Sequence, residues 1–225
     1  GEPIERTQVR VRMAARALGR NNLGHAYGHV SARLDEKTFL VCAPKPMGLV
    51  APEDEGTLVP IDGPLPQGVL GEVRCHQQIY KRRPDVNGIA RTFLRDVMTL
   101  STFERTPKPR IGFATYFAPC PPLWNDPALL RDDAQAAKFA ETLGDARAIV
   151  MRGNGCVLTG ATVEEAICMA FYLEEAAKTE LAVMATGQED RSLVLSDEQA
   201  RQRAVSSGQI FERMWQYLTA GDPEG

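Results

Sequence analysis

Two periodicities of hydrophobic and polar residues divide the sequence into predicted helices and strands. Residues 4–18 place apolar side chains three or four positions apart, with arginines at most of the remaining positions. This spacing predicts an amphipathic helix that ends at Gly19 or at the Asn21–Asn22 pair. We expect the arginines to form the solvated surface of this helix, which is the usual place for such charges.

The rest of the sequence alternates short apolar runs with longer amphipathic stretches. The short runs predict strands over residues 29–34, 39–42, 57–61, 87–93, 146–151 and 157–159. The longer stretches predict helices over residues 71–83, 128–143, 162–186 and 197–218, with a short helix up to Leu100. Residues 106–127 are rich in Pro and aromatic residues and predict an ordered loop. No linker or repeat interrupts the pattern, so we expect a single α/β domain over residues 1–225.

Composition and charge argue against several classes of partner. The 225 residues are 44% hydrophobic and 24% charged, and the net charge of −3 gives no electrostatic reason to expect nucleic acid or an anionic membrane. No apolar run approaches the roughly 20 residues that span a bilayer, and the first ten residues lack an apolar signal segment. The five scattered cysteines form no CxxC pair, which predicts a reducing, cytoplasmic location.

Glu72 and His76 are the first candidates for chemistry. They are four residues apart on a predicted helix and therefore share one face. The carboxylate can then orient the imidazole or accept a proton from it. A Glu–His pair at this spacing is also a common surface or packing pair, so the spacing leaves both interpretations open.

Two further patterns also have two interpretations each. His25 and His29 have the spacing of two zinc ligands on a helix, but Gly24 and Gly28 would interrupt that helix. Asn154 lies between two glycines in the turn that follows a predicted strand. Such a turn can bind a phosphate or oxyanion through its backbone N–H groups, or it can be an ordinary tight turn.

Five segments in a fixed order provide a stronger signal than any of these pairs. They are GHVSAR (28–33), Glu72 with Arg83-Pro84-Asp85, the strand IARTF (89–93), RGNG (152–155) and TVEEA (162–166). Through these segments the chain resembles the class II aldolase/adducin family over about residues 20–185. The resemblance implies a three-layer αβα fold with a central, mainly antiparallel sheet. It also implies a homo-oligomer, usually a tetramer with its active site near a subunit interface.

The departures from the family pattern affect the metal site. Where the resemblance places a His-x-His pair of metal ligands, this sequence has Arg91 and Phe93, and where it places the third ligand histidine there is Asn154. Arg carries a fixed positive charge and Phe has no lone pair, so neither replaces an imidazole on a divalent ion. We therefore expect no metal and no other cofactor. Glu72 occupies the position of the family's acid/base carboxylate.

The resemblance also bears on the substrate. The SSE segment with which the family's sugar-phosphate aldolases bind phosphate reads Leu70-Gly71-Glu72 here, and His29 stands in place of an Asn. A phosphorylated sugar is therefore disfavoured. The GHxS form and the Pro-rich middle segment are similar to the branch that contains decarboxylases of hydroxylated aromatic or dienoic acids.

The sequence therefore predicts a metal-independent decarboxylase of a hydroxylated aromatic, dienoic or keto carboxylic acid. Its predicted catalytic residues are Glu72 for proton transfer, Arg91 for binding the substrate carboxylate and His29 for hydrogen bonding. The predicted substrate-binding residues are Ser31, Asn154, His76 and Tyr116. Two alternatives stay open: a non-catalytic, adducin-like binding or assembly module, and a metal-dependent aldolase.

Overall fold

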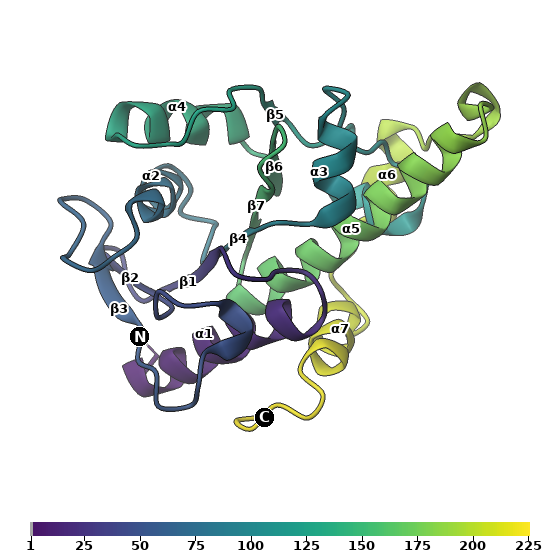
Figure 1. Cartoon of the computed structure of the whole chain (residues 1–225). Coiled ribbons are helices and arrows are strands. Elements are labelled where there is room, and N and C mark those ends of the chain that lie inside the picture. The colour runs from purple at the N-terminus through teal and green to yellow at the C-terminus, as the bar shows by residue number, and fades with distance from the viewer. Residues whose placement is uncertain (1) are drawn as a thin grey trace.

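The computed structural model describes residues 2–225 and contains one sheet between two layers of helices (Figure 1). The strands are β1 (His29–Arg33), β2 (Thr38–Val41), β3 (Thr57–Pro60), β4 (Gly88–Thr92), β5 (Leu123–Trp124), β6 (Ala148–Met151) and β7 (Cys156–Gly160). Their order across the seven-stranded sheet is β3-β2-β1-β4-β7-β6-β5. Neighbouring strands are antiparallel except β5 and β6, which run parallel. The expected mainly antiparallel sheet is confirmed.

Helices cover both faces of this sheet. The α-helices are α1 (Ile4–Arg20), α2 (Arg74–Arg82), α3 (Arg95–Ser101), α4 (Asp133–Leu143), α5 (Val163–Ala185), α6 (Asp197–Arg203) and α7 (Ile210–Leu218). Short 3₁₀ helices are η1 (Met47–Leu49), η2 (Gly71–Val73), η3 (Gly112–Phe117) and η4 (Glu189–Arg191). Helices α2 and α4 lie on one side of the sheet, and α1, α3 and α5 lie on the other (Figure 1). The expected three-layer αβα fold is confirmed.

Alternation along the strands gives each face its own hydrophobic core. On β4, Ile89 belongs to the core beneath α2 and α4, whereas the next residue, Ala90, belongs to the core beneath α1 and α5. Successive side chains of a strand point to opposite faces, so one strand contributes to both cores. The β4 residue two positions after Ile89 therefore points to the same face of the sheet, toward the helix layer in which Glu72 lies.

Segments rich in Pro or Gly differ most from the sequence-based expectation. The single helix expected over residues 197–218 is divided into α6, which ends at Arg203, and α7, which starts at Ile210; between them Gly208 and Gln209 adopt left-handed φ values of 73° and 59°. The helix expected over residues 128–143 starts only after Asp132, whose side chain caps α4 by accepting a backbone N–H. The loop expected over residues 106–127 contains η3 and β5.

Strand β4 lies in the middle of the sheet and is in close contact with α5. A Cβ atom at Gly88 would come within 2.3 Å of the Cα atom of Val163, so only glycine lets the helix approach this near. This contact sets the distance between β4 and α5, and with it the position of the β4 residues that follow Gly88.

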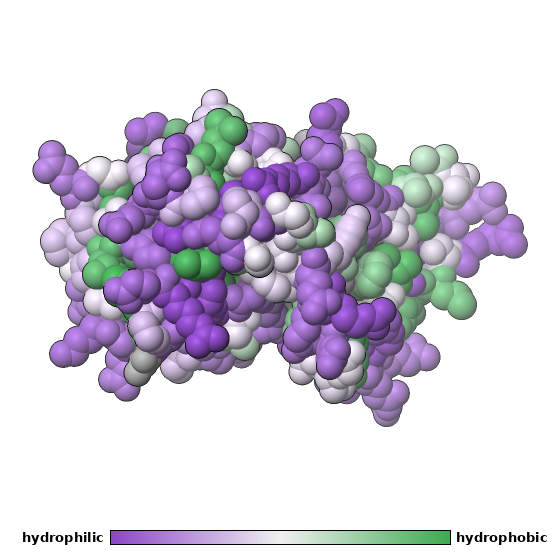
Figure 2. Space-filling view, turned by 90° about the horizontal axis from the view of Figure 1, so that it is seen from below, coloured by the Kyte–Doolittle hydropathy of each residue, from purple (hydrophilic) through white to green (hydrophobic). Residues whose placement is uncertain are grey.

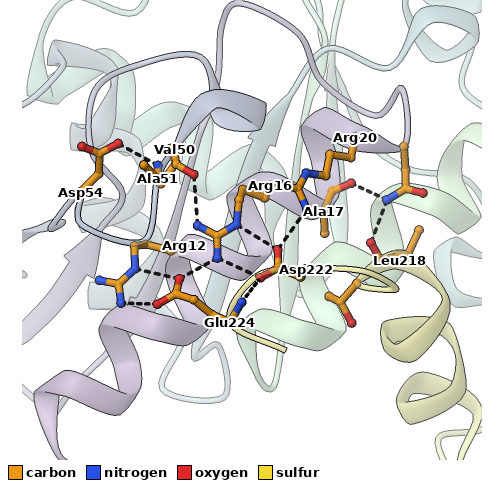
Figure 3. A network of polar contacts seen from close by, with 12 residues as sticks. Arg12, Arg16, Ala17, Arg20, Val50, Ala51, Asp54, Leu218, Asp222 and Glu224 are labelled. Atoms are coloured by element: carbon orange, nitrogen blue, oxygen red, sulfur yellow. Dashed lines mark hydrogen bonds and ion pairs between the residues drawn. The ribbon is translucent and has the colours of Figure 1, made fainter.

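A buried ion-pair network fastens the C-terminal segment to α1 (Figure 3). Arg16 donates from Nε and Nη2 to the two carboxylate oxygens of Asp222, at 2.9 and 3.0 Å, and from Nη1 to the carbonyl of Val50 at 3.0 Å. Arg12 makes paired hydrogen bonds to Glu224, at 3.0 and 2.7 Å. The side chains of Arg16 and Asp222 are 2% and 3% exposed. Burial opposes the ionisation of Asp222, but the hydrogen bonds from Arg16 and from the backbone of Glu224, together with the charges of Arg16 and Arg20, hold the pKa of Asp222 below its ordinary value.

The face shown in Figure 2 is mainly hydrophilic, with hydrophobic residues scattered over it. Such a mixture is usual for a folded domain, whose polar residues are too few to cover its whole surface. Among residues 2–225 there is no helix with both the length and the apolar character needed to cross a bilayer.

We expect Asp222→Ala to lower the free energy of unfolding by about 3 kcal/mol, because it leaves a buried guanidinium without its paired carboxylate. Urea denaturation at pH 7 measures this loss. The control is Asp62→Ala, which removes an ion pair to Lys81 in which the aspartate is 87% exposed. That variant should cost less than about 1 kcal/mol. Similar losses in the two variants would show that the network contributes no more than a surface pair.

Candidate functional site

A cavity of about 370 Å³ lies where β1, β4, η2 and the turn between β6 and β7 meet. Its wall contains Glu72 from η2, His29 from β1, Arg91 from β4 and Asn154 from the β6–β7 turn. Four of the predicted site residues are thus brought together from four separate segments. The volume is within the range of small-molecule binding sites.

The central contact of the cavity joins Arg91 to Glu72. Arg91 donates a hydrogen bond from Nε to Oε1 of Glu72 and another from Nη1 to the carbonyl of Thr92, at 3.2 Å. The Arg91 side chain is only 2% exposed, whereas that of Glu72 is 22% exposed. The guanidinium carbon also lies 4.2 Å from the ring centre of Phe93, in a cation–π contact. Arg91 is therefore held by the protein itself, with the carboxylate at the cavity surface.

Strand pairing places His29 beside Arg91. The two residues are opposite each other in the antiparallel pair of β1 and β4, so their side chains emerge on the same face. Gly28 and Gly155 make room around them. A Cβ at Gly28 would come within 2.4 Å of the carbonyl oxygen of Arg91, and a Cβ at Gly155 within 2.7 Å of its Nη1. Both glycines have positive φ, which larger residues rarely adopt.

Behind His29 lies a line of buried hydrogen bonds, which we call the His29 network: His29, His76, Ser31 and Tyr80. His29 Nδ1 is 2.8 Å from His76 Nε2, His76 Nδ1 is 2.6 Å from Ser31 Oγ, and Ser31 Oγ is 2.9 Å from Tyr80 Oη. The four residues are between 0% and 5% exposed. Two periodicities build the network: His29 and Ser31 are two apart on β1, and His76 and Tyr80 are four apart on α2.

The two histidines of this network are neutral. Burial, reinforced by the nearby positive charge of Arg91, lowers the pKa of His29 to about 3. Burial also holds the pKa of His76 well below its ordinary value, with further contributions from His29 and Arg91. Each imidazole therefore carries one proton at neutral pH and acts once as a donor and once as an acceptor.

Three predicted substrate-binding residues lie away from the cavity wall. Ser31 and His76 lie behind His29, where they are 0% and 1% exposed, so they reach the cavity only through it. Tyr116 belongs to a different part of the molecule: its ring is stacked on Tyr172, and its hydroxyl donates to the carbonyl of Val205 at 2.6 Å. The structure therefore places Asn154, but not these three residues, where a ligand in this cavity would touch it.

The cavity wall contains further residues that the sequence analysis did not assign to ligand binding. Phe93 and Tyr27 form an aromatic wall, with ring centres 6.2 Å apart, and Lys45 adds an ammonium group that also bonds to Asp54 at 2.7 Å. No spacing rule singles out Lys45, which lies in a loop. Tyr80, by contrast, could have been found, because it continues the Glu72–His76 spacing by one more helical turn.

The structure bears on two sequence patterns that had two interpretations each, the turn around Asn154 and the His25–His29 spacing. In the turn around Asn154, the N–H of Gly153 donates to Ser101 Oγ and the N–H of Asn154 to the carbonyl of Met151, both at 2.9 Å. Two of the turn's N–H groups are thus used within the protein, as in an ordinary tight turn. His25 is exposed and stacks on Phe93, with ring centres 5.7 Å apart.

The donors present do not fit a divalent cation. Within residues 2–225 no three His, Cys, Asp or Glu side chains are grouped as metal ligands would be. His29 Nε2 and Glu72 Oε1 are 3.9 Å apart, but the same carboxylate oxygen accepts the hydrogen bond from Arg91. A guanidinium thus lies directly against the one carboxylate of this set and competes with any cation for it.

Comparisons with known sequences identify the family of the chain. A sequence model of the Class II Aldolase and Adducin N-terminal domain matches residues 9–181. The chain is 26% identical over 204 residues to 3,4-dihydroxyphthalate decarboxylase from Arthrobacter keyseri, covering 83% of this chain and 82% of that protein. It is also 26% identical over 205 residues to 3,4-dihydroxyphthalate decarboxylase from Terrabacter sp. (strain DBF63), covering 82% of each chain.

Solved structures show the same fold. An L-fuculose 1-phosphate aldolase from Glaciozyma antarctica PI12 superposes with a TM-score of 0.79 and 19% identity, over 96% of this chain and 87% of that one. An aldolase II superfamily protein from Pseudomonas syringae gives a TM-score of 0.79 and 21% identity, over 95% of this chain and 90% of that one. At this level of identity the likeness concerns the fold alone.

The neutral histidines predict a specific pH dependence of stability. Because their folded-state pKa values are lowered, protons bind the unfolded state more readily, and stability falls as the pH drops below about 6.5. Each such histidine should cost about 2 kcal/mol between pH 7 and pH 5. In urea denaturation we expect His76→Gln to remove the contribution of this histidine to the pH dependence of the free energy of unfolding. This holds whatever the free energy of unfolding of the variant is at pH 7. His25→Gln, which changes an exposed ring outside the network, is the control. An unchanged pH dependence in His76→Gln would contradict the neutral assignment.

Proposed function

Because this chain belongs to the class II aldolase and adducin family, we propose that it is a carbon–carbon lyase, and specifically a metal-independent decarboxylase of a hydroxylated aromatic carboxylic acid. The observation that carries the proposal is the grouping of Glu72, Arg91, His29 and Asn154 in one cavity beside an aromatic wall. The named decarboxylases among its relatives support the same reaction class.

The cavity suits an anionic aromatic ligand. Phe93 and Tyr27 offer ring faces and edges for stacking, which aromatic ligands favour over contact with water. Lys45 and Asn154 line the same cavity and supply hydrogen-bond donors for carboxylate or hydroxyl oxygens. Arg91 adds positive charge, although its Nε is already bound to Glu72. A substrate carboxylate therefore meets the Arg91 charge together with Lys45, and does not displace Glu72.

Loss of CO₂ from a ring carboxylate consumes one proton per turnover. A hydroxyl group ortho or para to the carboxylate pushes electron density into the ring, so that the ring carbon bearing the carboxylate can take up a proton. The C–C bond then breaks, CO₂ leaves, and the electron pair of that bond restores the aromatic ring. Glu72 is suited to deliver this proton, because its side chain lies at the cavity surface and is partly exposed to solvent from which it can be reprotonated.

The site supplies its positive charge through Arg91. In the proposed reaction the hydroxyl group of the substrate is the source of electrons, so no Lewis acid is required to polarise a carbonyl. Arg91 fixes the orientation of Glu72, and the cation–π contact with Phe93 and the hydrogen bond to Thr92 fix Arg91 in turn. His29 completes the set with Nε2, which lies 3.9 Å from Glu72 Oε1 and is available to a substrate oxygen.

A non-catalytic, adducin-like binding module is the second candidate. The observation that favours it is the Arg91–Glu72 ion pair itself, because an arginine whose role is only structural is also expected to be paired with a protein carboxylate. Under that assignment Arg91→Ala lowers stability without changing the affinity for any aromatic acid. Under the decarboxylase assignment the same variant also weakens binding of the acid.

A homo-oligomer stays part of the proposal. Tyr27, Leu70 and Leu129 line the cavity and are 67%, 44% and 51% exposed. Apolar side chains gathered at the rim of a site are suited to burial against another protein surface. A second copy of the chain would then close the cavity and reduce the access of water to it.

We expect Glu72→Gln to lower the turnover of CO₂ release by about 10²- to 10⁴-fold, because the amide cannot carry the proton. Its affinity for the acid should not fall, because the amide keeps the shape of the side chain and the lost negative charge repelled an anionic ligand. The assay follows CO₂ release from 3,4-dihydroxyphthalate and a panel of hydroxylated benzoates, with binding measured by calorimetric titration.

Glu141→Gln is the matched control, because Glu141 is an exposed residue of α4 that does not line the cavity. It should leave turnover unchanged. If no acid of the panel binds or releases CO₂ at millimolar concentration, the decarboxylase assignment is wrong. If one is turned over and Glu72→Gln retains the full rate, the reaction stands but Glu72 does not transfer the proton.

A further inference from the structure

The His29 network has only two consistent arrangements of protons. Its two histidines are neutral and share one hydrogen bond, between His29 Nδ1 and His76 Nε2, so one proton must lie between these nitrogens. If His29 donates, both rings carry their proton on Nδ1. If His76 donates, both rings carry it on Nε2. Mixed arrangements place two protons or none in the 2.8 Å contact.

The inner end of the network favours one direction. Within residues 2–225, Ser31 Oγ is the hydrogen-bond partner of Tyr80 Oη. With both protons on Nδ1, His76 would donate to Ser31, and either the Ser31 or the Tyr80 hydroxyl proton would be left without an acceptor among residues 2–225. Ser31 and Tyr80 are 0% and 2% exposed, so an unpaired hydroxyl at either residue is costly. With both protons on Nε2, Tyr80 donates to Ser31, Ser31 donates to His76 and His76 donates to His29, so the buried protons of the network are paired and only the proton on His29 Nε2 faces the cavity.

The outer end favours the same direction. His29 Nε2 lies 3.9 Å from Glu72 Oε1 at the cavity. A proton on His29 Nε2 faces this carboxylate oxygen with a positive partial charge, which is favourable in a site of low dielectric. The opposite arrangement would present a lone pair to the same oxygen.

We propose that Ser31 and His76 are positioning residues that fix His29 as a permanent hydrogen-bond donor, with its proton on Nε2 facing Glu72 and the cavity, and that Tyr80 only completes the hydrogen bonding of Ser31. The consequence concerns ligand recognition. The ligand atom beside His29 must be an acceptor, such as a carboxylate, carbonyl or phenolate oxygen, and an amine or other pure donor is rejected there. The tautomer rests on the network geometry and on the neutrality of its two histidines, and not on the proposed function. Only its use toward a substrate rests on the proposed function.

Nitrogen-15 NMR of the whole protein at pH 7 tests the tautomer directly. Long-range proton–nitrogen correlation spectra distinguish protonated from unprotonated ring nitrogens, and a chain with three histidines is simple to assign with His25→Gln. We expect His29 and His76 both to be protonated on Nε2 and unprotonated on Nδ1. Protonation of both rings on Nδ1, or of either ring on both nitrogens, would overturn the inference.

Two variants separate positioning from packing. Ser31→Ala removes the donor to His76 Nδ1, so we expect a detectable population of the Nδ1-protonated tautomer, together with lower turnover on the acid that the wild type decarboxylates. Tyr80→Phe leaves the Ser31 hydroxyl able to donate, so the Nε2 tautomers should persist. Loss of the Nε2 tautomer in Tyr80→Phe, or its full retention in Ser31→Ala, would contradict the assigned roles.

The two proposals fail separately. The spectrum of the free wild-type protein decides the tautomer whether or not any substrate is found. Nε2-protonated rings without any turnover would leave the tautomer established and the decarboxylase assignment wrong. Turnover with Nδ1-protonated rings would support the decarboxylase assignment and show that the inferred tautomer is wrong.

Discussion

The burial of the Arg91 guanidinium is the constraint on which the site depends. A charge that is 2% exposed requires a partner, because an unpaired buried ion costs several kcal/mol. Glu72 is that partner, so η2 and the start of α2 must lie directly over the ends of β1 and β4. Once the start of α2 is fixed, its helical period carries His76 and Tyr80 over Ser31 and the rest of the His29 network forms.

The same ion pair is the basis of our proposal that the site of this chain works without a metal ion. The resemblance places metal ligands at the positions of Arg91, Phe93 and Asn154. Here Arg91 provides a fixed cation, Phe93 supports it through its ring face, and Asn154 lines the cavity. A cation thus lies beside Glu72, but it is a side chain with directional N–H groups and not an ion that can accept ligand lone pairs.

Much of this arrangement could be predicted from the sequence. The periods of 2 and 3.6 residues located the strands and helices, and the order of five short segments identified the fold and placed Glu72, Arg91, His29 and Asn154 in one site. The failures have physical causes. Tyr116 lies in a Pro-rich segment without periodicity, where only tertiary packing decides that its ring stacks on Tyr172. The break in the last helix covers residues 204–209, where Gly208 and Gln209 adopt left-handed φ, and a single glycine within a periodic pattern does not by itself predict such a break.

The positions of Ser31 and His76 could not be predicted from the sequence for a different reason. Polar residues near a predicted site are natural candidates for ligand contact, and a sequence does not show that another residue lies in front of them. Their burial behind His29 follows from the contact between a strand face and a helix face, which is a long-range property. Through such contacts, two residues that were predicted to bind the ligand instead hold a third residue, His29, in place.

The central claim is that Arg91 supplies the positive charge that metal ions provide elsewhere in the family. Elemental analysis and CO₂ release, measured on the same chelator-treated protein with a hydroxylated aromatic acid, test it most directly. The account predicts no stoichiometric transition metal and unchanged turnover after chelation. Turnover that is lost on chelation and restored by zinc or manganese would contradict it.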